Sequence, residues 1–137
     1  MEICFDYLFE PRFSDFDSYA IAHHSKYFCW FEEARFYFLR NILKMSNEDI
    51  SDIRCPLINL SCEFKKLITY GEAYIISSQI IFDMEIAKIK FVYQIYNNDK
   101  TVRFANGVTE HVFLSSEGKL LFKMPNKLIL RLNDLVK

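Results

Sequence analysis

The feature that most constrains the fold is a long apolar segment from about residue 25 to residue 44. It contains neither Gly nor Pro, and its apolar residues recur at helical spacing, so it predicts a helix with Ser25 as the N-cap. The spaced positions are Tyr27, Phe28, Phe31, Ala34, Phe38, Leu39 and Ile42. Further apolar residues lie between them, including Cys29, Trp30 and Phe36. A helix that is apolar on most of its circumference is unsuited to a surface. We therefore expect a buried central helix.

After Pro56 the pattern changes to the alternation typical of strands. Four such runs cover residues 57–65, 73–82, 89–96 and 102–114. In the third run Ile89, Phe91, Tyr93 and Ile95 share one face, as in a sheet covered on one side. The turns at 97–100 and 115–118 are hairpin-sized, which favours an antiparallel meander.

The remaining segments complete the expected order of elements. Residues 3–13 are compatible with a first strand that Pro11 places near an edge or an end. Residues 46–52 indicate a short helical turn or loop. Pro125 suits the first position of a terminal helix with an apolar stripe. The chain thus predicts an α+β fold in which one antiparallel sheet wraps around a long central helix.

Length and charge limit the possible functions. With 137 residues and 51% hydrophobic content, the chain should form a single domain over residues 1–137. Such a domain is too small to enclose a deep cleft alone, so a pocket needs a second subunit. The formal charge of -1, from 17 basic and 18 acidic residues, argues against nucleic acid or an anionic membrane as a partner.

The cysteines and the N-terminus indicate a cytoplasmic protein. The four cysteines form no C-x-x-C pair and no Cys/His cluster with zinc spacing, so we expect buried free thiols and no metal site. The first dozen residues are acidic and lack the basic flank of a signal peptide. No segment approaches the roughly 20 apolar residues of a membrane span.

Residues 15–35 concentrate the groups that could perform chemistry. Asp15, Asp17, His23 and His24 lie within ten residues, just before the long helix. Carboxyl and imidazole groups titrate on either side of neutrality and exchange protons readily. The first turn of a helix also presents free backbone N–H groups that can hold an oxyanion. This arrangement favours a hydrolytic site at the start of the helix.

The same residues resemble the acyl-CoA thioesterases of the 4-hydroxybenzoyl-CoA thioesterase type, which have the hotdog fold. The matching positions are Asp15-x-Asp17, His24, Tyr27 and Phe31-Glu32-x-Ala34-Arg35, followed by weaker matches at Tyr70-Gly71-Glu72, Lys88-Ile89-Lys90-Phe91 and Pro125. The resemblance covers nearly the whole chain. It implies a hotdog fold and a homodimer joined edge to edge, with a homotetramer as a frequent further step. The chain departs from the family at Ala20, where Gly is usual; a positive φ there would cost about 1 kcal/mol.

The resemblance also implies roles for individual residues. Asp17 would attack the thioester carbonyl or activate water, whereas its alternative is an Asx-turn. His24 would polarise the carbonyl or protonate the thiolate, unless it is a structural histidine. The backbone N–H groups of Ala20 and Ile21 are the candidate oxyanion hole. Asp15 is expected to form structural hydrogen bonds.

Three more residues are candidates for substrate contact. Glu32 would line the pocket from the helix, but it can instead pair with Arg35 three residues later. Lys88 and Lys90 share one strand face and could hold the phosphates of coenzyme A, or simply be solvated.

The sequence therefore predicts hydrolysis of an acyl-CoA or acyl carrier protein thioester to free acid and thiol, without a cofactor beyond the coenzyme A of the substrate. Two alternatives remain open. One is a hydratase or dehydratase that pairs His23 or His24 with Glu32. The other is a non-catalytic acyl-CoA binding protein, which Ala20 makes credible.

Overall fold

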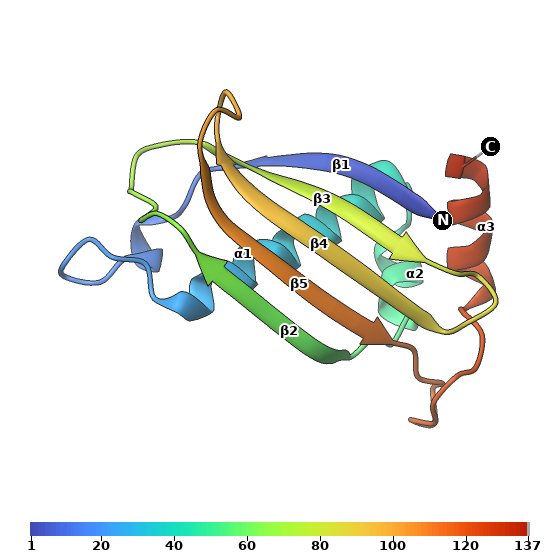
Figure 1. Ribbon diagram of the computed structural model, residues 1–137. Coiled ribbons are helices and arrows are strands. Elements are labelled where there is room, and N and C mark those ends of the chain that lie inside the picture. The colour runs from blue at the N-terminus through green and yellow to red at the C-terminus, as the bar shows by residue number, and fades with distance from the viewer. Residues whose placement is uncertain (137) are drawn as a thin grey trace.

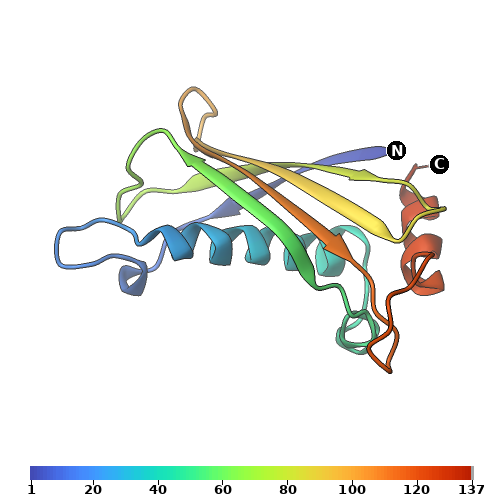
Figure 2. The same cartoon turned by 60° about the horizontal axis from the view of Figure 1, so that its bottom comes forward.

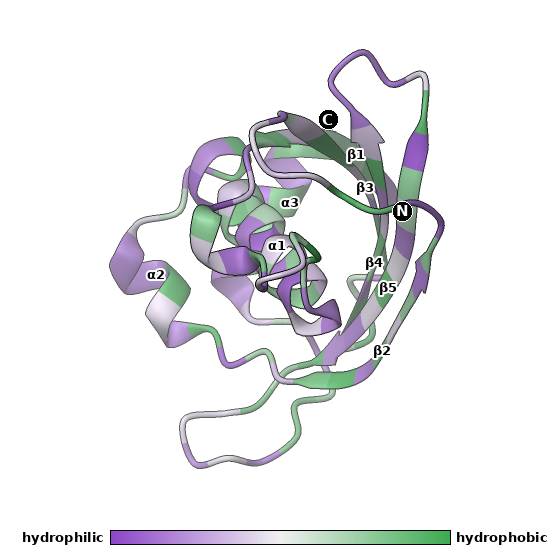
Figure 3. Ribbon diagram, turned by 90° about the vertical axis from the view of Figure 1, so that its left-hand side faces the viewer, coloured by the Kyte–Doolittle hydropathy of each residue, from purple (hydrophilic) through white to green (hydrophobic). Residues whose placement is uncertain are grey.

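The computed structural model describes residues 1–136. Helix α1 (His24–Tyr37) crosses one face of a five-stranded antiparallel sheet, as Figures 1 and 2 show. The strands are β1 (Glu2–Phe9), β2 (Leu57–Phe64), β3 (Tyr74–Phe82), β4 (Lys88–Asn97) and β5 (Arg103–Val112). Seen from the end, the sheet curves around α1 (Figure 3). The predicted α+β hotdog architecture is confirmed.

The strand order differs from a simple meander. It is β1-β3-β4-β5-β2, so β2 lies at one edge beside β5, and β1 lies at the other edge beside β3. The predicted turn at 97–100 joins β4 to β5, and residues 83–87 join β3 to β4. Between β2 and β3, residues 65–73 form a connection long enough to cross from one side of the sheet to the other. Local strand patterns carry no information about such a crossing.

Helix α1 begins two residues earlier than a Ser25 N-cap predicts, because its cap is His23. His23 has extended backbone geometry, and its imidazole Nδ1 accepts the backbone N–H of Ser25 at 3.2 Å. Ser25, the predicted N-cap, thus lies inside the first turn. At the other end α1 continues into the π-helical turn η2 (Phe38–Ile42), where Leu43 N–H donates to the Phe38 carbonyl at 2.9 Å.

Only one side of α1 is buried. Tyr27, Trp30, Phe31 and Ala34 pack against the sheet. Cys29, Glu32 and Phe36 are exposed on the opposite side. The expectation of a helix buried all round is therefore wrong for the single chain.

The contact between α1 and the middle of the sheet depends on a glycine. The Phe31 ring stacks on Tyr93 with centroids 4.3 Å apart and planes within 8°. A Cβ at Gly107 would collide with Phe31 Cε2, so a larger residue in β5 would displace this ring. On β4, Ile89, Phe91, Tyr93 and Ile95 are buried on the face toward α1, as the alternation predicted.

Two helices lie at the end of the sheet far from residues 10–23 (Figure 1). α2 (Asn47–Asp52) confirms the predicted helical turn, capped by Ser46 Oγ at 3.1 Å from Asp49 N. α3 (Asn126–Val136) buries Leu128 and Leu132. Pro125 precedes α3 as a cap rather than occupying its first position, and its carbonyl accepts the first helical N–H bonds.

The environment of the cysteines corrects another expectation. All four thiols are free, as predicted. Cys4 and Cys29 are nevertheless exposed, whereas Cys55 and Cys62 are partly buried. Within residues 1–136, no helix combines the length and the apolar character needed to cross a membrane.

Candidate functional site

A tight loop at the start of α1 presents Asp17. Phe16 and Ala22 form an isolated antiparallel bridge that closes the loop. Inside it, Asp17 N–H donates to the Ile21 carbonyl and Ala20 N–H donates to the Asp17 carbonyl, each at 3.0 Å. Ala20 has φ 61°, the left-handed conformation that favours glycine. The strain expected at this position is therefore present.

The Asp17 carboxylate is fixed by backbone donors. Its Oδ1 accepts the N–H of Tyr19 at 2.8 Å and that of Ile21 at 3.1 Å, which is the Asx-type geometry of the alternative interpretation. Both bonds use the same oxygen. Because the side chain is exposed, its Oδ2 is accessible to a substrate or a water molecule. The turn thus holds the carboxylate in one orientation and leaves one oxygen for chemistry.

The predicted oxyanion hole does not form in this arrangement. The N–H of Ile21 donates to Asp17 Oδ1, and that of Ala20 donates to the Asp17 carbonyl. Both donors are occupied because the loop needs them to close around the left-handed residue. Sequence reasoning placed free N–H groups here without knowledge of this turn.

Asp15 has the structural role that was expected. Its Oδ2 accepts the backbone N–H of Arg12 at 2.9 Å and the indole N–H of Trp30 at 3.0 Å. These bonds tie the 3-10 turn η1 (Phe13–Asp15) to the buried side of α1. Asp15 therefore anchors the loop that carries Asp17.

His24 lines a hollow beside this loop. The hollow has a volume of about 370 Å³ and is bounded by Ala22, His24, Tyr27, Phe64, Lys65, Lys66 and Leu67. Tyr27 meets the Phe64 ring edge-on at 4.7 Å, and burial raises the pKa of its hydroxyl. The His23 ring lies tilted against the His24 ring with centroids 4.0 Å apart, but His23 Nδ1 caps the helix. Of the two histidines, His24 is the one that lines the hollow.

Lys65 and Lys66 are the cations that sequence reasoning missed. They follow β2 directly and line the hollow together with His24. Lys65 also pairs with Glu63 at 2.9 Å. Two adjacent lysines at the end of a predicted strand could have indicated an anion-binding site. Their position beside the start of α1, however, follows only from the sheet topology.

Lys88 and Lys90 lie elsewhere. They begin β4 on the face turned away from α1, since Ile89 and Phe91 between them are buried toward the helix. Lys88 pairs with Glu110 at 2.8 Å, and Lys90 is the direct cross-strand partner of the same residue. This end of the sheet is opposite the Asp17 loop (Figure 1). One chain does not bring these lysines to Asp17.

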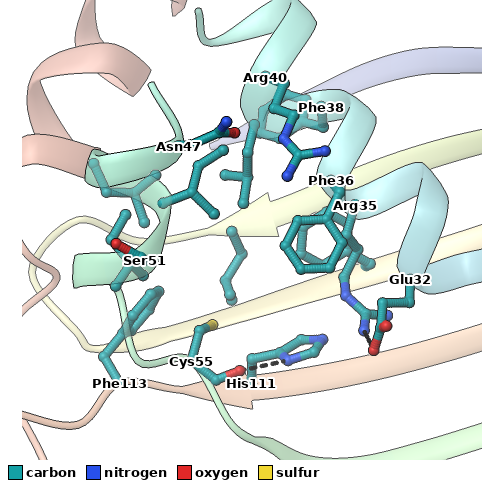
Figure 4. Close-up of a pocket in the computed structure, with 16 residues that line it drawn as sticks. Glu32, Arg35, Phe36, Phe38, Arg40, Asn47, Ser51, Cys55, His111 and Phe113 are labelled. Carbon is teal, nitrogen blue, oxygen red and sulfur yellow. Dashed lines mark hydrogen bonds and ion pairs between the residues drawn. The ribbon is translucent and has the colours of Figure 1, made fainter. Parts of the chain in front are cut away.

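Glu32 lines a second and larger cavity between α1, α2 and the sheet, shown in Figure 4. Its Oε2 lies 3.7 Å from Arg35 Nη2, so the alternative pairing with Arg35 is the one formed. Glu32 is also eight residues beyond His24, about 12 Å along the helix. A hydratase pair of His23 or His24 with Glu32 is thus not assembled within one chain.

A chain of hydrogen bonds forms the polar wall of this cavity. Arg35 Nη1 lies 3.0 Å from the Tyr93 hydroxyl, which lies 2.7 Å from Thr109 Oγ1. Thr109 Oγ1 lies 3.0 Å from His111 Nε2, and His111 Nδ1 lies 3.3 Å from the Cys55 carbonyl. Sequence reasoning did not select these residues; the only signal was polar side chains at alternate positions of strands with a buried face.

The groups at the two ends of this series of hydrogen bonds determine which atom donates and which accepts in each bond. A guanidinium only donates and a carbonyl only accepts, so His111 carries its proton on Nδ1 and accepts from Thr109 at Nε2. Burial, followed by the positive charge of Arg35, lowers the pKa of His111 to about 4. Burial raises the pKa of the Cys55 thiol to about 12. At neutral pH the wall therefore contains a neutral imidazole and a neutral thiol.

Comparison with known proteins identifies the family. The family model of the thioesterase-like superfamily matches residues 11–132. The chain belongs to the thioesterase-like superfamily. A curated protein of Aquifex aeolicus with the name "Putative esterase" is 30% identical over 133 residues, covering 95% of this chain and 98% of that protein.

Two solved thioesterases share the fold of this superfamily member. The 1,4-dihydroxy-2-naphthoyl-CoA thioesterase of Synechocystis superposes with a TM-score of 0.83 at 19% identity, over 98% of each chain. The DHNA-CoA thioesterase of Staphylococcus aureus gives a TM-score of 0.74 at 24% identity, over 87% of this chain and 80% of that one. At these identities the likeness establishes the hotdog fold.

The side chains suited to metal binding are dispersed. Within residues 1–136, no group of three or more His, Cys, Asp or Glu residues could hold a metal ion. The hollow beside the Asp17 loop is lined by an imidazole, a phenol and two ammonium groups. This set is suited to proton transfer and to binding an anionic substrate.

Proposed function

We propose that the protein is a thioesterase that hydrolyses an acyl-CoA or acyl carrier protein thioester to the free acid and the thiol. The observation that carries this proposal is the Asp17 carboxylate, held through Oδ1 by two backbone N–H groups with Oδ2 accessible. Membership of the thioesterase-like superfamily and the likeness to two CoA thioesterases support it.

Asp17 acts in one of two ways. As a general base, its Oδ2 takes a proton from water while the water oxygen attacks the thioester carbon; the C–S bond then breaks and the thiolate takes up a proton. As a nucleophile, Oδ2 attacks the same carbon and expels the thiolate, and water then hydrolyses the mixed anhydride. His24 donates a hydrogen bond to the carbonyl oxygen or a proton to the thiolate. This role matters more because the N–H groups of Ala20 and Ile21 donate within the loop and are not free to bind the oxyanion.

The hollow beside the loop is the proposed site of the thioester. Tyr27 and Phe64 provide apolar contact, and Lys65 and Lys66 lie where they could bind the phosphates of coenzyme A. Lys88 and Lys90 remain candidates only if a second subunit brings them near. Replacing both Lys65 and Lys66 by Met should raise KM for an acyl-CoA by about tenfold or more, whereas the same change at Lys88 and Lys90 should leave it unchanged. If KM rises only when Lys88 and Lys90 are replaced, these two residues of β4 bind the phosphates instead.

The assembly is proposed to be a homodimer joined through β2, with a homotetramer as the possible further step. β2 forms one edge of the sheet, and its apolar residues Leu57, Ile58, Leu60 and Phe64 are exposed in the single chain. An exposed apolar edge is a template for pairing with another strand. The native mass in solution should be at least twice the 16.4 kDa of one chain. A mass of one chain at micromolar concentration would refute this assembly.

The decisive test of function is thiol release from a panel of acyl-CoA and aroyl-CoA thioesters. Turnover of any member supports hydrolysis, and the preferred member defines the acyl group. If the protein binds these thioesters without releasing thiol, it is instead a binding protein, and the Ala20→Gly variant should be assayed next.

A further inference from the structure

The cavity between α1, α2 and the sheet has the properties of a small-molecule site. Its volume is about 480 Å³, within the roughly 300–1,000 Å³ range of ligand pockets. Most of its wall is apolar, formed by side chains that include Phe36, Phe38, Ile50, Phe91, Phe113 and Leu128. Arg35 and Glu32 lie near His111 on one side of the cavity, whereas Arg40, Asn47 and Ser51 lie on the other side (Figure 4). The cavity is thus largely apolar, with polar groups on two sides.

Arg35 is a largely buried cation whose ion-pair partner, Glu32, is a loosely held and mostly exposed carboxylate. The Arg35 side chain is only 18% exposed. The carboxylate of Glu32 lies at 3.7 Å, beyond hydrogen-bonding distance, and the Glu32 side chain is 61% exposed. A buried charge is costly unless it is paired and hydrogen-bonded, so this guanidinium is incompletely compensated.

The hydrogen-bond chain does not supply the missing negative charge. Arg35 donates to Tyr93, and the direction of the chain makes Tyr93 a neutral donor to Thr109. Burial raises the pKa of the Tyr93 hydroxyl, so that the phenol stays protonated at neutral pH. The positive charge of Arg35 acts to lower the pKa of Tyr93, His111 and Cys55, because it disfavours the protonated form of each group. Apart from the exposed Glu32 carboxylate, the charged group on this side of the cavity is therefore the Arg35 guanidinium.

We propose that this cavity binds a monocarboxylate with an apolar tail, such as a medium-chain fatty acid. The carboxylate pairs with Arg35, whose planar fork suits bidentate binding, and the tail packs among the phenylalanine rings. Glu32 moves into solvent when the ligand enters. Arg40, which lies 5.6 Å from the Phe36 ring centre and also lines the cavity, adds a second cation at its wall.

This site is separate from the Asp17 loop within the chain. Arg35 lies eleven residues beyond His24, about 16 Å along α1. The loop lies at one end of the sheet and α2 at the other (Figure 2). Binding here does not rest on the proposed hydrolysis, and it is measured without turnover.

The test compares octanoate with octanamide by isothermal titration calorimetry on the whole protein at pH 7.5. The two probes share the tail and differ in charge. We expect octanoate to bind at least tenfold more tightly, and Arg35→Met to abolish this difference. Equal affinity for the two probes, or binding of neither one, would overturn the proposal.

Two further variants test the proposal even if Arg35→Met does not fold. Glu32→Gln removes the competing carboxylate from an exposed side chain, so it should tighten octanoate binding severalfold and leave octanamide unchanged. Asp17→Asn is the matched control and should leave the octanoate affinity unchanged. If Asp17→Asn alters that affinity and Glu32→Gln does not, the carboxylate binds at the Asp17 loop and the cavity has no such role.

Discussion

Replacing Asp17 by Asn separates the chemistry of this residue from its structural role. Asn keeps a carbonyl oxygen that can accept the N–H groups of Tyr19 and Ile21 at the 2.8 Å and 3.1 Å positions. The loop is therefore retained, and the free energy of unfolding should change by less than about 0.5 kcal/mol, as for other exposed substitutions. What is lost is the basic and nucleophilic Oδ2.

Loss of a general base or nucleophile lowers the rate by about 10²- to 10⁴-fold, or about 3–5 kcal/mol in activation free energy. The assay is steady-state thiol release with the best thioester of the panel, alongside thermal unfolding of each variant. The matched control is Asp15→Asn, two residues earlier, which keeps an acceptor for Arg12 and Trp30 and should retain activity within a few-fold. If Asp17→Asn hydrolyses the thioester as fast as the native protein, Asp17 is not the catalytic group.

Three further substitutions test the surrounding structure. Ala20→Gly relieves the positive φ of 61° and should stabilise the protein by about 0.5–1 kcal/mol in urea unfolding; a lower midpoint would show that this residue is unstrained. Gly107→Ala places a methyl group against Phe31 and should destabilise by about 1–3 kcal/mol, and an unchanged midpoint would contradict the close contact. His111 has a folded pKa of about 4 against 6.5 when unfolded, so the unfolded state binds more protons between these values and stability falls as pH drops through that window. From pH 7.5 to pH 5.0 the loss should reach about 2 kcal/mol, and it should be absent in His111→Gln, which lacks the titrating group; equal losses in both proteins would exclude His111 as the cause.

The helix and the strands were predictable because their signals are local. The absence of Gly and Pro around Phe31 and Phe38 indicated the helix, and the alternation from Ile89 to Ile95 indicated a strand with one buried face. The N-cap was wrong because an imidazole took the place that a serine hydroxyl usually fills. The burial of Cys29 was wrong because periodicity shows which residues are apolar, whereas exposure depends on what packs against the helix.

The candidate site was partly predictable. The sequence motif selected Asp17 and His24, and the structure places them in and after one loop beside a hollow. Its lysines were not predictable, because Lys65 approaches His24 only through the position of β2 at the sheet edge. Ala20 and Ile21 failed as oxyanion donors because a left-handed turn consumes their N–H groups, which no spacing rule reveals.

The sequence by itself determined the types of element, their order along the chain and the identity of the carboxylate presented before the helix. These properties follow from side-chain periodicity and from residues adjacent in the chain. Tertiary structure alone decided the strand order and the hydrogen-bond chain from Arg35 to the Cys55 carbonyl. The last of these joins residues up to 58 positions apart, and only sheet register and the packing of α1 bring such residues within hydrogen-bonding distance.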